Sequence, residues 1–172
     1  MRKIILGVAV SLDSYIEGPN GEYDWCFTDQ DYGMSDFFQR VDASFYGRKS
    51  YELAQTMGDI PASFPKLKEY VFSNTLNTVK PGVVLVNGDI RKQVLDIKQG
   101  PGKDIWLYGG ASLTAALMQL GLVDELWLSV HPLLLGSGKH LFSHLPGRVP
   151  LQLIDTKTYS TGLVSLTYKI SS

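Results

Sequence analysis

The amino-acid sequence predicts a single α/β domain in which helices cover both faces of a mixed β-sheet. Two observations support this fold class. Up to residue 121, short apolar runs alternate with helical patterns, as in a mostly parallel sheet. Beyond it, three long β-like segments follow with no helical pattern between them, which indicates an antiparallel C-terminal end. The 172 residues contain no linker or internal repeat, so we expect one domain over residues 1–172.

The first elements are predicted from their apolar patterns. Residues 3–10 form a nearly continuous apolar run, which is typical of a strand buried on both faces. Residues 11–20 contain turn residues and are expected to form a loop, and residues 21–33 have no clear period and are expected to be irregular. Residues 34–40 suit a short helix, and residues 43–46 suit a short strand.

The middle and the end of the chain continue the pattern. A helix is expected at residues 48–55, strands at 70–73 and 83–86, and an amphipathic helix at 89–99 with Asp89 as its N-cap. A buried strand at 105–108 leads through Gly109-Gly110 into a helix with Leu113, Leu117 and Leu120 on one face. The β-like segments of the C-terminal end are residues 124–132, 151–159 and 164–170.

Composition and charge argue against several classes of protein. A formal net charge of −1 argues against a broad nucleic-acid contact. With Cys26 as the one cysteine, neither an intramolecular disulfide nor a cysteine-based metal cluster is possible. The basic N-terminus precedes an apolar run that is too short for a signal peptide and is followed by no cleavage site. We therefore expect a cytoplasmic protein with no metal and no membrane or nucleic-acid partner.

The pair Gly109-Gly110 has features of a phosphate site. A strand, a glycine turn and a helix leave free backbone N–H groups at the helix N-terminus, and glycine lets a ligand approach the backbone. The first helical turn contains no acid to offset the positive end of the helix dipole. The alternative is an ordinary helix start with Ser112 as its N-cap.

A second glycine-led helix start follows the strand at 43–46. Here Gly47 precedes Arg48, Lys49 and Ser50, and two cations at the positive end of a helix dipole are unfavourable unless an anion binds. Arginine could bind a phosphate with two hydrogen bonds and the serine could donate one; the alternative is that both cations are solvated surface residues. Two such starts suggest the two ends of one polyphosphate, as in a dinucleotide, although the GxGxxG fingerprint of the Rossmann fold is absent.

A third polar cluster, Ser73-Asn74-Thr75, follows the strand at 70–73. Ligands of α/β sheets bind where strands end, so this cluster is expected at the edge of the same crevice. The alternative is a turn rich in serine and asparagine.

Five motifs in order resemble the dihydrofolate reductase-like superfamily: VAVSLDSYI (8–16), YGRKSYE (46–52), VFSN (71–74), YGGASL (108–113) and VDEL (123–126). Within it, SLDSYIEGPNGE (11–22) and HPLLLGSGKHLF (131–142) are more similar to the RibD C-terminal domain family, which includes the pyrimidine reductase of riboflavin biosynthesis. The resemblance implies a three-layer fold with an eight-stranded, mostly parallel sheet and an antiparallel C-terminal end. It also implies NADPH as the hydride donor, and a homodimer.

The resemblance also implies cofactor contacts, residue by residue. Gly47, Arg48, Lys49 and Ser50 match the segment that holds the adenosine-side phosphates, and Ser73 and Asn74 match the segment near the 2′-phosphate or ribose. The run Tyr108, Gly109, Gly110, Ala111, Ser112 and Leu113 matches the turn at the pyrophosphate, where dihydrofolate reductases have a cis Gly-Gly bond. Ala9, Val10 and Ile16 match the strand end and loop beside the nicotinamide.

On the substrate side, two acids are candidates for a catalytic role. Asp36 is nearest to the carboxylate with which dihydrofolate reductases hold a pterin, although its spacing is shorter than in that family; the alternative is a first-turn helix acid. Asp13 matches an acid of the SLDG-type segment, here with Ser14 in place of glycine, and could face the substrate or cap its turn. Tyr15 and Trp25 could stack on the substrate or belong to the core.

The leading hypothesis is therefore an NADPH-dependent reductase of the RibD C-terminal type. It would transfer hydride to a heterocycle, either a pyrimidine like 5-amino-6-(5-phosphoribosylamino)uracil, a pterin or a related ring. The sequence contains no zinc-ligand pattern of a deaminase, so the reductase would stand alone. The rival hypotheses are a nucleotide-binding module without turnover and a phosphate-binding transferase that uses no nicotinamide. Residues 133–135 and the C-terminal strand are the expected dimer contacts.

Overall fold

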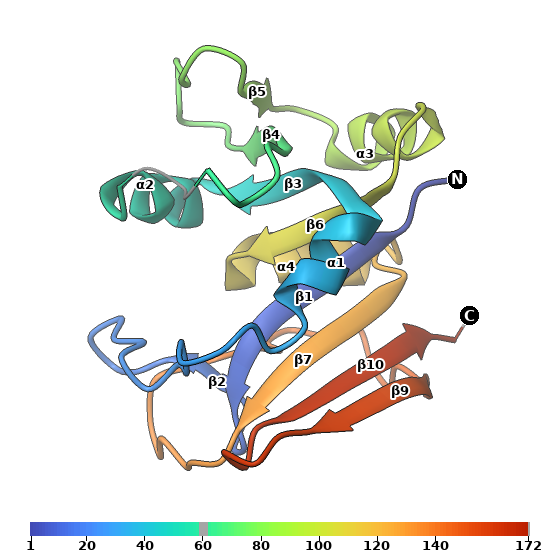
Figure 1. Cartoon of the computed structure of the whole chain (residues 1–172). Coiled ribbons are helices and arrows are strands. Elements are labelled where there is room, and N and C mark those ends of the chain that lie inside the picture. Colours follow the sequence, from blue (N-terminus) through green and yellow to red (C-terminus); the bar gives the residue numbers. More distant parts are fainter. Residues whose placement is uncertain (59–61, 172) are drawn as a thin grey trace.

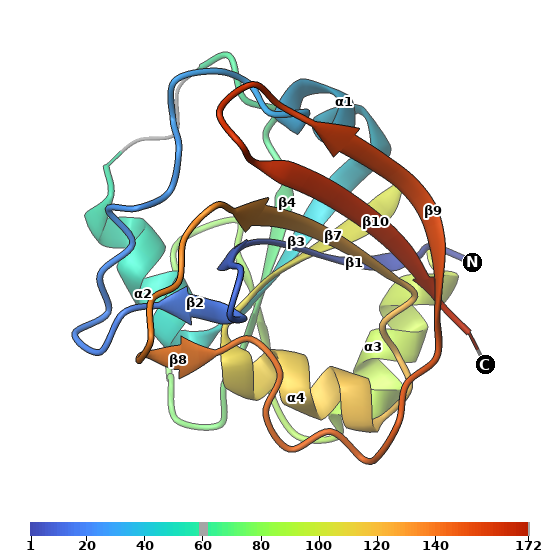
Figure 2. The same ribbon diagram turned by 90° about the horizontal axis from the view of Figure 1, so that it is seen from below.

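The computed structural model describes residues 1–58 and 62–171, which form three layers with one large β-sheet in the middle (Figures 1 and 2). The order of the eight strands in this sheet is β5-β4-β3-β6-β1-β7-β10-β9. Their bounds are β1 (Ile4–Ser11), β3 (Val41–Gly47), β4 (Lys68–Phe72), β5 (Val84–Val86), β6 (Asp104–Gly109), β7 (Glu125–His131), β9 (Leu151–Thr158) and β10 (Val164–Ile170). The helices are α1 (Met34–Arg40), α2 (Arg48–Thr56), α3 (Ile90–Gln99) and α4 (Ala111–Gln119).

The strands from β5 to β7 run parallel, and β10 and β9 are the antiparallel members of the sheet. The predicted fold class, a mostly parallel sheet with an antiparallel C-terminal end, is therefore confirmed. Since β10 pairs with β7 on one side and with β9 on the other, the free edge at this end of the sheet belongs to β9 and not to the C-terminal strand.

Each face of the sheet is covered by two helices (Figure 2). On one face, Val94 of α3 and Leu117 of α4 are fully buried with Leu6, Phe45 and Leu107 from the strands. The opposite face is covered by α1 and α2, and its apolar layer is rich in aromatic side chains: Phe37, Tyr46 and Tyr51 are buried, and Trp106 and Trp127 are partly buried. Burying each such side chain stabilises the fold by roughly 1.5–3 kcal/mol, so these two apolar layers hold the helices to the sheet.

A second, two-stranded sheet was not predicted. Its strands are β2 (Tyr15–Glu17) and β8 (Lys139–His140), which pair antiparallel. The prediction of a loop over residues 11–20 is therefore wrong for residues 15–17. Two strands this short have no readable period, and only the fold brings them together.

Charged side chains gather where the parallel strands begin. The Glu125 side chain, at the start of β7, is only 4% exposed and accepts hydrogen bonds from Lys3 Nζ at 2.6 Å and from Arg40 NH2 at 2.7 Å. Burial raises the pKa of this carboxyl, but the hydrogen bonds and charges of Lys3 and Arg40 outweigh burial and lower the pKa below its usual value. This cluster ties β1, β7 and the end of α1 together.

We expect the variant Glu125→Gln to lower the free energy of unfolding at neutral pH by about 1–3 kcal/mol, because it removes hydrogen bonds to a charged group. Since the folded-state pKa of Glu125 lies below its unfolded value of 4.5, its contribution is present above pH 4.5 and lost as the pH falls further. Urea unfolding across this range should be less pH-dependent in the variant. Equal pH dependence of the two proteins would contradict the assignment.

Candidate functional site

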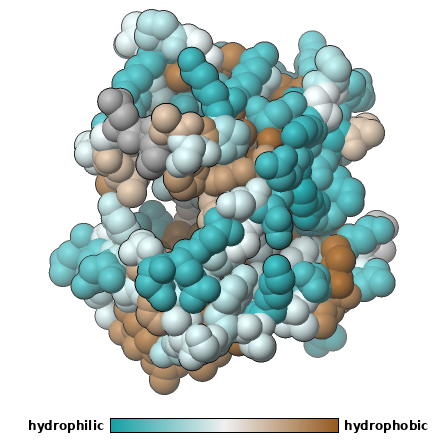
Figure 3. Space-filling view, in the orientation of Figure 1, coloured by the Kyte–Doolittle hydropathy of each residue, from teal (hydrophilic) through white to brown (hydrophobic). Residues whose placement is uncertain are grey.

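The carboxyl ends of β1, β3, β4 and β6 open into a cleft of about 700 Å³. A space-filling view shows a recess on the face that carries α2 and β2 (Figure 3). Strands β3 and β6 are neighbours, with Tyr46 paired to Gly109. The helices that follow these two strands, α2 and α4, therefore both begin at the cleft.

The two helix starts approach closely, and both begin at glycine. A Cβ on Gly47 would lie 3.4 Å from the backbone nitrogen of Gly110, and a Cβ on Gly110 would lie 3.0 Å from Ser50 Oγ. The peptide bond between Gly109 and Gly110 is cis. At Gly109, with φ of 124°, a Cβ would meet no atom within 4 Å, so glycine there is required by the backbone conformation.

At neither helix start does a side chain offset the positive end of the helix dipole. Both α2 and α4 begin without a side-chain cap and without an acid in the first turn. By contrast, α3 is capped by Asp89, whose side chain accepts a hydrogen bond from Lys92 N at 3.0 Å. The alternative with Ser112 as the N-cap of α4 is wrong, because Gly110 is the N-cap and Ser112 lies exposed in the first turn. The cleft therefore receives the positive ends of two helix dipoles.

The cleft brings together the predicted cofactor contacts with one exception. Val10 does not line it, because its side chain is buried in the core. The predicted residues that line the cleft are Ala9, Ile16, Gly47, Arg48, Lys49, Ser50, Ser73, Asn74, Tyr108, Gly109, Gly110, Ala111, Ser112 and Leu113.

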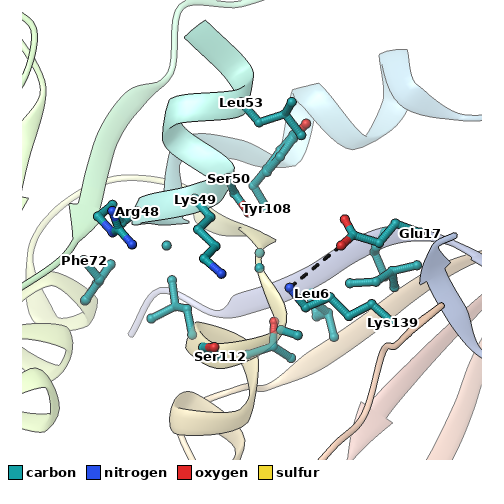
Figure 4. A pocket seen from close by; sticks show the side chains of 18 of the residues that line it. Leu6, Glu17, Arg48, Lys49, Ser50, Leu53, Phe72, Tyr108, Ser112 and Lys139 are labelled. Carbon is teal, nitrogen blue, oxygen red and sulfur yellow. Dashed lines mark ion pairs between the residues drawn. The ribbon is translucent and has the colours of Figure 1, made fainter. Parts of the chain in front are cut away.

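Three basic side chains line the cleft, two of which were predicted. Arg48 and Lys49 belong to the first turn of α2, and Arg48 also forms an exposed ion pair with Glu52 at 3.6 Å. The third is Lys139 of β8, which the sequence analysis missed; its side chain extends into the cavity opposite Lys49 (Figure 4). Of the described residues that line the cleft, Glu17 alone is a carboxylate.

A second cavity of about 360 Å³ adjoins the cleft. Gly7, Val8, Ala9, Cys26 and Trp106 line both cavities, so the two meet over β1. Five aromatic side chains line the second cavity: Phe27, Tyr32, Phe64, Trp106 and Trp127. Its other titratable side chains, besides Tyr32, are Cys26, Asp31 and His131. A planar ring suits such walls.

His131 fixes the segment that closes this cavity. Its Nε2 accepts a hydrogen bond from Phe27 N at 3.1 Å, so the proton is on Nδ1, which donates to the carbonyl of Ser129 at 2.9 Å. Burial lowers the pKa of His131, so the ring is neutral at neutral pH. Asp31 accepts hydrogen bonds from the backbone and hydroxyl of Ser35, and the hydroxyl bond lowers the pKa of this carboxyl. The sequence analysis missed both residues.

The two acids predicted for catalysis line neither cavity. Asp36 is exposed in the first turn of α1. Asp13 accepts hydrogen bonds from the Ser11 hydroxyl at 2.6 Å and from the backbone nitrogens of Leu135 and Gly136 at 3.1 and 2.8 Å, which lower its pKa to about 2. These are the contacts of a turn cap. A catalytic role for either acid stays a prediction.

The predicted aromatic walls also lie beside the cavities rather than in them. Tyr15 stacks on His140, with ring centroids 4.3 Å apart. Trp25 contacts His131 edge-on and donates a long hydrogen bond, 3.3 Å, to the carbonyl of Glu22. Neither residue lines the cleft or the second cavity.

Within residues 1–58 and 62–171, no group of three or more His, Cys, Asp or Glu side chains could hold a metal ion. Over the same residues, no helix is long and apolar enough to cross a membrane.

The three-layer architecture, the strand order and the cleft at the strand ends define a dihydrofolate reductase-like α/β protein. The chain belongs to the RibD C-terminal domain family, whose sequence profile matches residues 2–165. It is 44% identical over 177 residues to the uncharacterized protein YyaP of Bacillus subtilis, an alignment that covers 97% of this chain and 94% of YyaP.

Solved structures agree with this membership. A putative riboflavin biosynthesis protein from Shewanella sp. PV-4 is similar over the full length of both chains, with a TM-score of 0.86 and 27% identity. The fold is shared with two more distant proteins, each 13% identical. One is a diaminohydroxyphosphoribosylaminopyrimidine deaminase/5-amino-6-(5-phosphoribosylamino)uracil reductase from Thermotoga maritima (TM-score 0.78; 99% of this chain, 57% of that one). The other is dihydrofolate reductase from Enterococcus faecalis in complex with NADP(H) (TM-score 0.72; 99% and 97%).

We expect mild acid to destabilise the segment that His131 holds. The folded-state pKa of His131 lies below its unfolded value of 6.5, so its contribution to stability is present above pH 6.5 and falls as the pH drops further. Urea unfolding at pH 7 and about pH 5.5 should show a smaller pH effect in His131→Gln, which does not titrate there. An unchanged pH effect in the variant would contradict this role.

Proposed function

We propose that this protein is a reductase that uses NADPH to reduce a heterocyclic small molecule. The main support is the cleft where two glycine-led helix starts without acids meet beside Arg48 and Lys49. A dinucleotide has the negative charges for such a site, at its pyrophosphate and, in NADPH, at the 2′-phosphate. The family supports the reaction class, because its distant fold relatives include a pyrimidine reductase and a dihydrofolate reductase in complex with NADP(H).

The residues present fit this cofactor. The glycines at both helix starts leave the backbone open to a phosphate, and a side chain at Gly47 or Gly110 would crowd the other helix start. We assign Arg48, Lys49 and Ser50 to the adenosine-side phosphates, with Ser73 and Asn74 beside them. The α4 start then holds the pyrophosphate, and Ala9 and Ile16 flank the nicotinamide, which supplies the hydride when NADPH is bound.

We assign the second cavity to the substrate. It meets the cleft over β1 beside Ala9, so a ring held there would adjoin the nicotinamide end of the site. Its aromatic walls suit a pyrimidine, a pterin or a related heterocycle. Asp31 has a lowered pKa and is ionised at neutral pH, and both ring nitrogens of His131 already hold hydrogen bonds within the protein. Neither residue is then a proton donor, so we propose that a water hydrogen-bonded to the Asp31 carboxylate delivers the proton.

The second candidate function is a nucleotide-binding module without turnover. The observation in its favour is that Asp13 and Asp36, the two acids expected to act in catalysis, line neither cavity. The two functions differ in one result. Both require NADPH binding, whereas the reductase alone oxidises NADPH when a suitable heterocycle is added.

We further propose that the protein is a cytoplasmic homodimer. The free edge strand β9 exposes Leu153 and Ile154 by 51% and 52%, and Leu134 in the loop after β7 is 71% exposed. Exposed apolar side chains along a free strand edge are features that a second copy could cover. We infer the cytoplasmic location from the sequence. Its one cysteine cannot form an intramolecular disulfide, and proteins without disulfides are typical of the cytoplasm.

We expect purified protein to bind NADPH and the variant Arg48→Ala to bind it at least about tenfold more weakly, because the variant loses a charge-assisted hydrogen bond. Titration followed by nicotinamide fluorescence measures both affinities, with NADH as the comparison ligand. Arg91→Ala on α3 is a matched control, since it removes a cation whose NH1 bonds the carbonyl of Leu120 and which does not line the cleft. Failure of the wild-type protein to bind either dinucleotide would overturn the reductase proposal.

Light scattering should give a mass of twice the 19.1 kDa of one chain. If β9 is the contact, Leu153→Asp should shift this mass toward the monomer while Leu134→Asp leaves it unchanged. The reverse pattern would place the contact at residues 133–135. A wild-type monomer would contradict the dimer.

A further inference from the structure

Lys139 and Glu17 form an ion pair at the border of the cleft. The Lys139 ammonium lies 3.9 Å from Glu17 Oε1, and both side chains line the cavity (Figure 4). The two residues face each other in the β2–β8 sheet, where Glu17 pairs with Lys139. Glu17 is the one carboxylate among the described lining residues, and it therefore lies beside Lys139, the one lining cation that does not belong to α2.

The backbone of β8, which carries Lys139, packs closely against that of β2, which carries Glu17. A Cβ on Gly138 would lie 2.1 Å from the carbonyl oxygen of Glu17, so β8 reaches β2 only because residue 138 is glycine. Tyr15 stacks on His140, and Leu141 N donates to the carbonyl of Ser14 at 2.9 Å. These contacts on both sides hold the Lys139 backbone in place at the cleft.

The side-chain pair itself is loose. Its separation of 3.9 Å is longer than a hydrogen bond, and the two side chains are 43% and 34% exposed. The pair of Lys98 and Asp124 differs, with a separation of 2.7 Å and a lysine side chain that is only 7% exposed. Lys139 can therefore exchange its partner at little cost, whereas Lys98 is part of the permanent structure.

We propose that Lys139 is a cofactor-binding residue that leaves Glu17 to bind the pyrophosphate of the dinucleotide. This inference rests on the proposed function. A phosphate oxygen within reach forms a stronger, charge-assisted hydrogen bond than the present pair. Glu17 competes for the ammonium and repels the incoming anion, so it weakens binding and selects for a ligand with enough negative charge to displace it.

The place of Lys139 distinguishes the pyrophosphate from the 2′-phosphate. Its partner Glu17 directly follows Ile16, which we assign to the nicotinamide end of the site. Arg48 lies on α2, with Ser73 and Asn74 at the opposite, adenosine end. A cation between the nicotinamide end and the α4 start meets the pyrophosphate, which NADH and NADPH share.

The test is titration of wild-type protein, Lys139→Gln, Lys139→Arg and Glu17→Gln with NADPH and with NADH. Loss of a charge-assisted hydrogen bond should make Lys139→Gln bind both dinucleotides about tenfold more weakly or worse, by equal factors. Lys139→Arg keeps the charge and should retain most of the affinity. Glu17→Gln should bind both dinucleotides more tightly, by about two- to threefold, because it removes a competing and repelling charge.

Lys92→Gln, on the exposed side of α3, is the matched control for the loss of one positive charge and should bind as wild type. Thermal unfolding of each variant establishes that it is folded before titration. If the wild type binds NADPH and Lys139→Gln binds it equally well, this inference is overturned and the proposed function stands. If Lys139→Gln weakens the binding of NADPH much more than the binding of NADH, Lys139 contacts the 2′-phosphate and the pyrophosphate assignment is wrong. If the wild type binds neither dinucleotide, both proposals fail.

Discussion

The close approach of Gly47 and Gly110 is the constraint on which the site depends. Parallel neighbours β3 and β6 end at the same edge of the sheet, and the following helices begin side by side, where a Cβ on Gly110 would crowd Ser50 Oγ at 3.0 Å and a Cβ on Gly47 would touch Gly110 N at 3.4 Å. Because the first helical turns have no side-chain caps or acids, their backbone N–H groups are left for a ligand. The close approach of the two helix starts thus shapes the cleft, and their first turns without acids give it a positive potential.

Charge is divided between the two edges of the sheet. At the edge where the parallel strands begin, short ion pairs join secondary elements: Lys3 and Arg40 with Glu125, and Lys98 with Asp124. At the edge where these strands end, the cations point into a cavity and their ion pairs are long and exposed. The first arrangement contributes to stability because one partner of each pair is buried and the pair is hydrogen-bonded, whereas the second leaves cations available to an anion.

Local sequence signals were sufficient for the fold class and for most of the cleft. Each apolar run, each glycine break and the cap at Asp89 lies within a few consecutive residues. Most of the elements and the two helix starts could therefore be predicted. The β2–β8 sheet, Lys139 and the second cavity depend on contacts between segments far apart in the chain. His131, for example, holds the irregular segment at Phe27 from β7, and no local pattern predicts such a contact.

Gly7 shows how such a distant contact shapes the site. The sequence marks it only as one residue of a buried strand, yet a Cβ there would lie 2.9 Å from Trp106 Nε1 and 3.2 Å from the Trp127 ring. Without that Cβ, the Trp106 indole lies against β1 and donates a hydrogen bond of 2.9 Å to the Gly7 carbonyl. Trp106 lines both cavities. A larger residue at position 7 would displace this shared wall, so the meeting of the two cavities over β1, which the proposed hydride transfer requires, depends on this glycine.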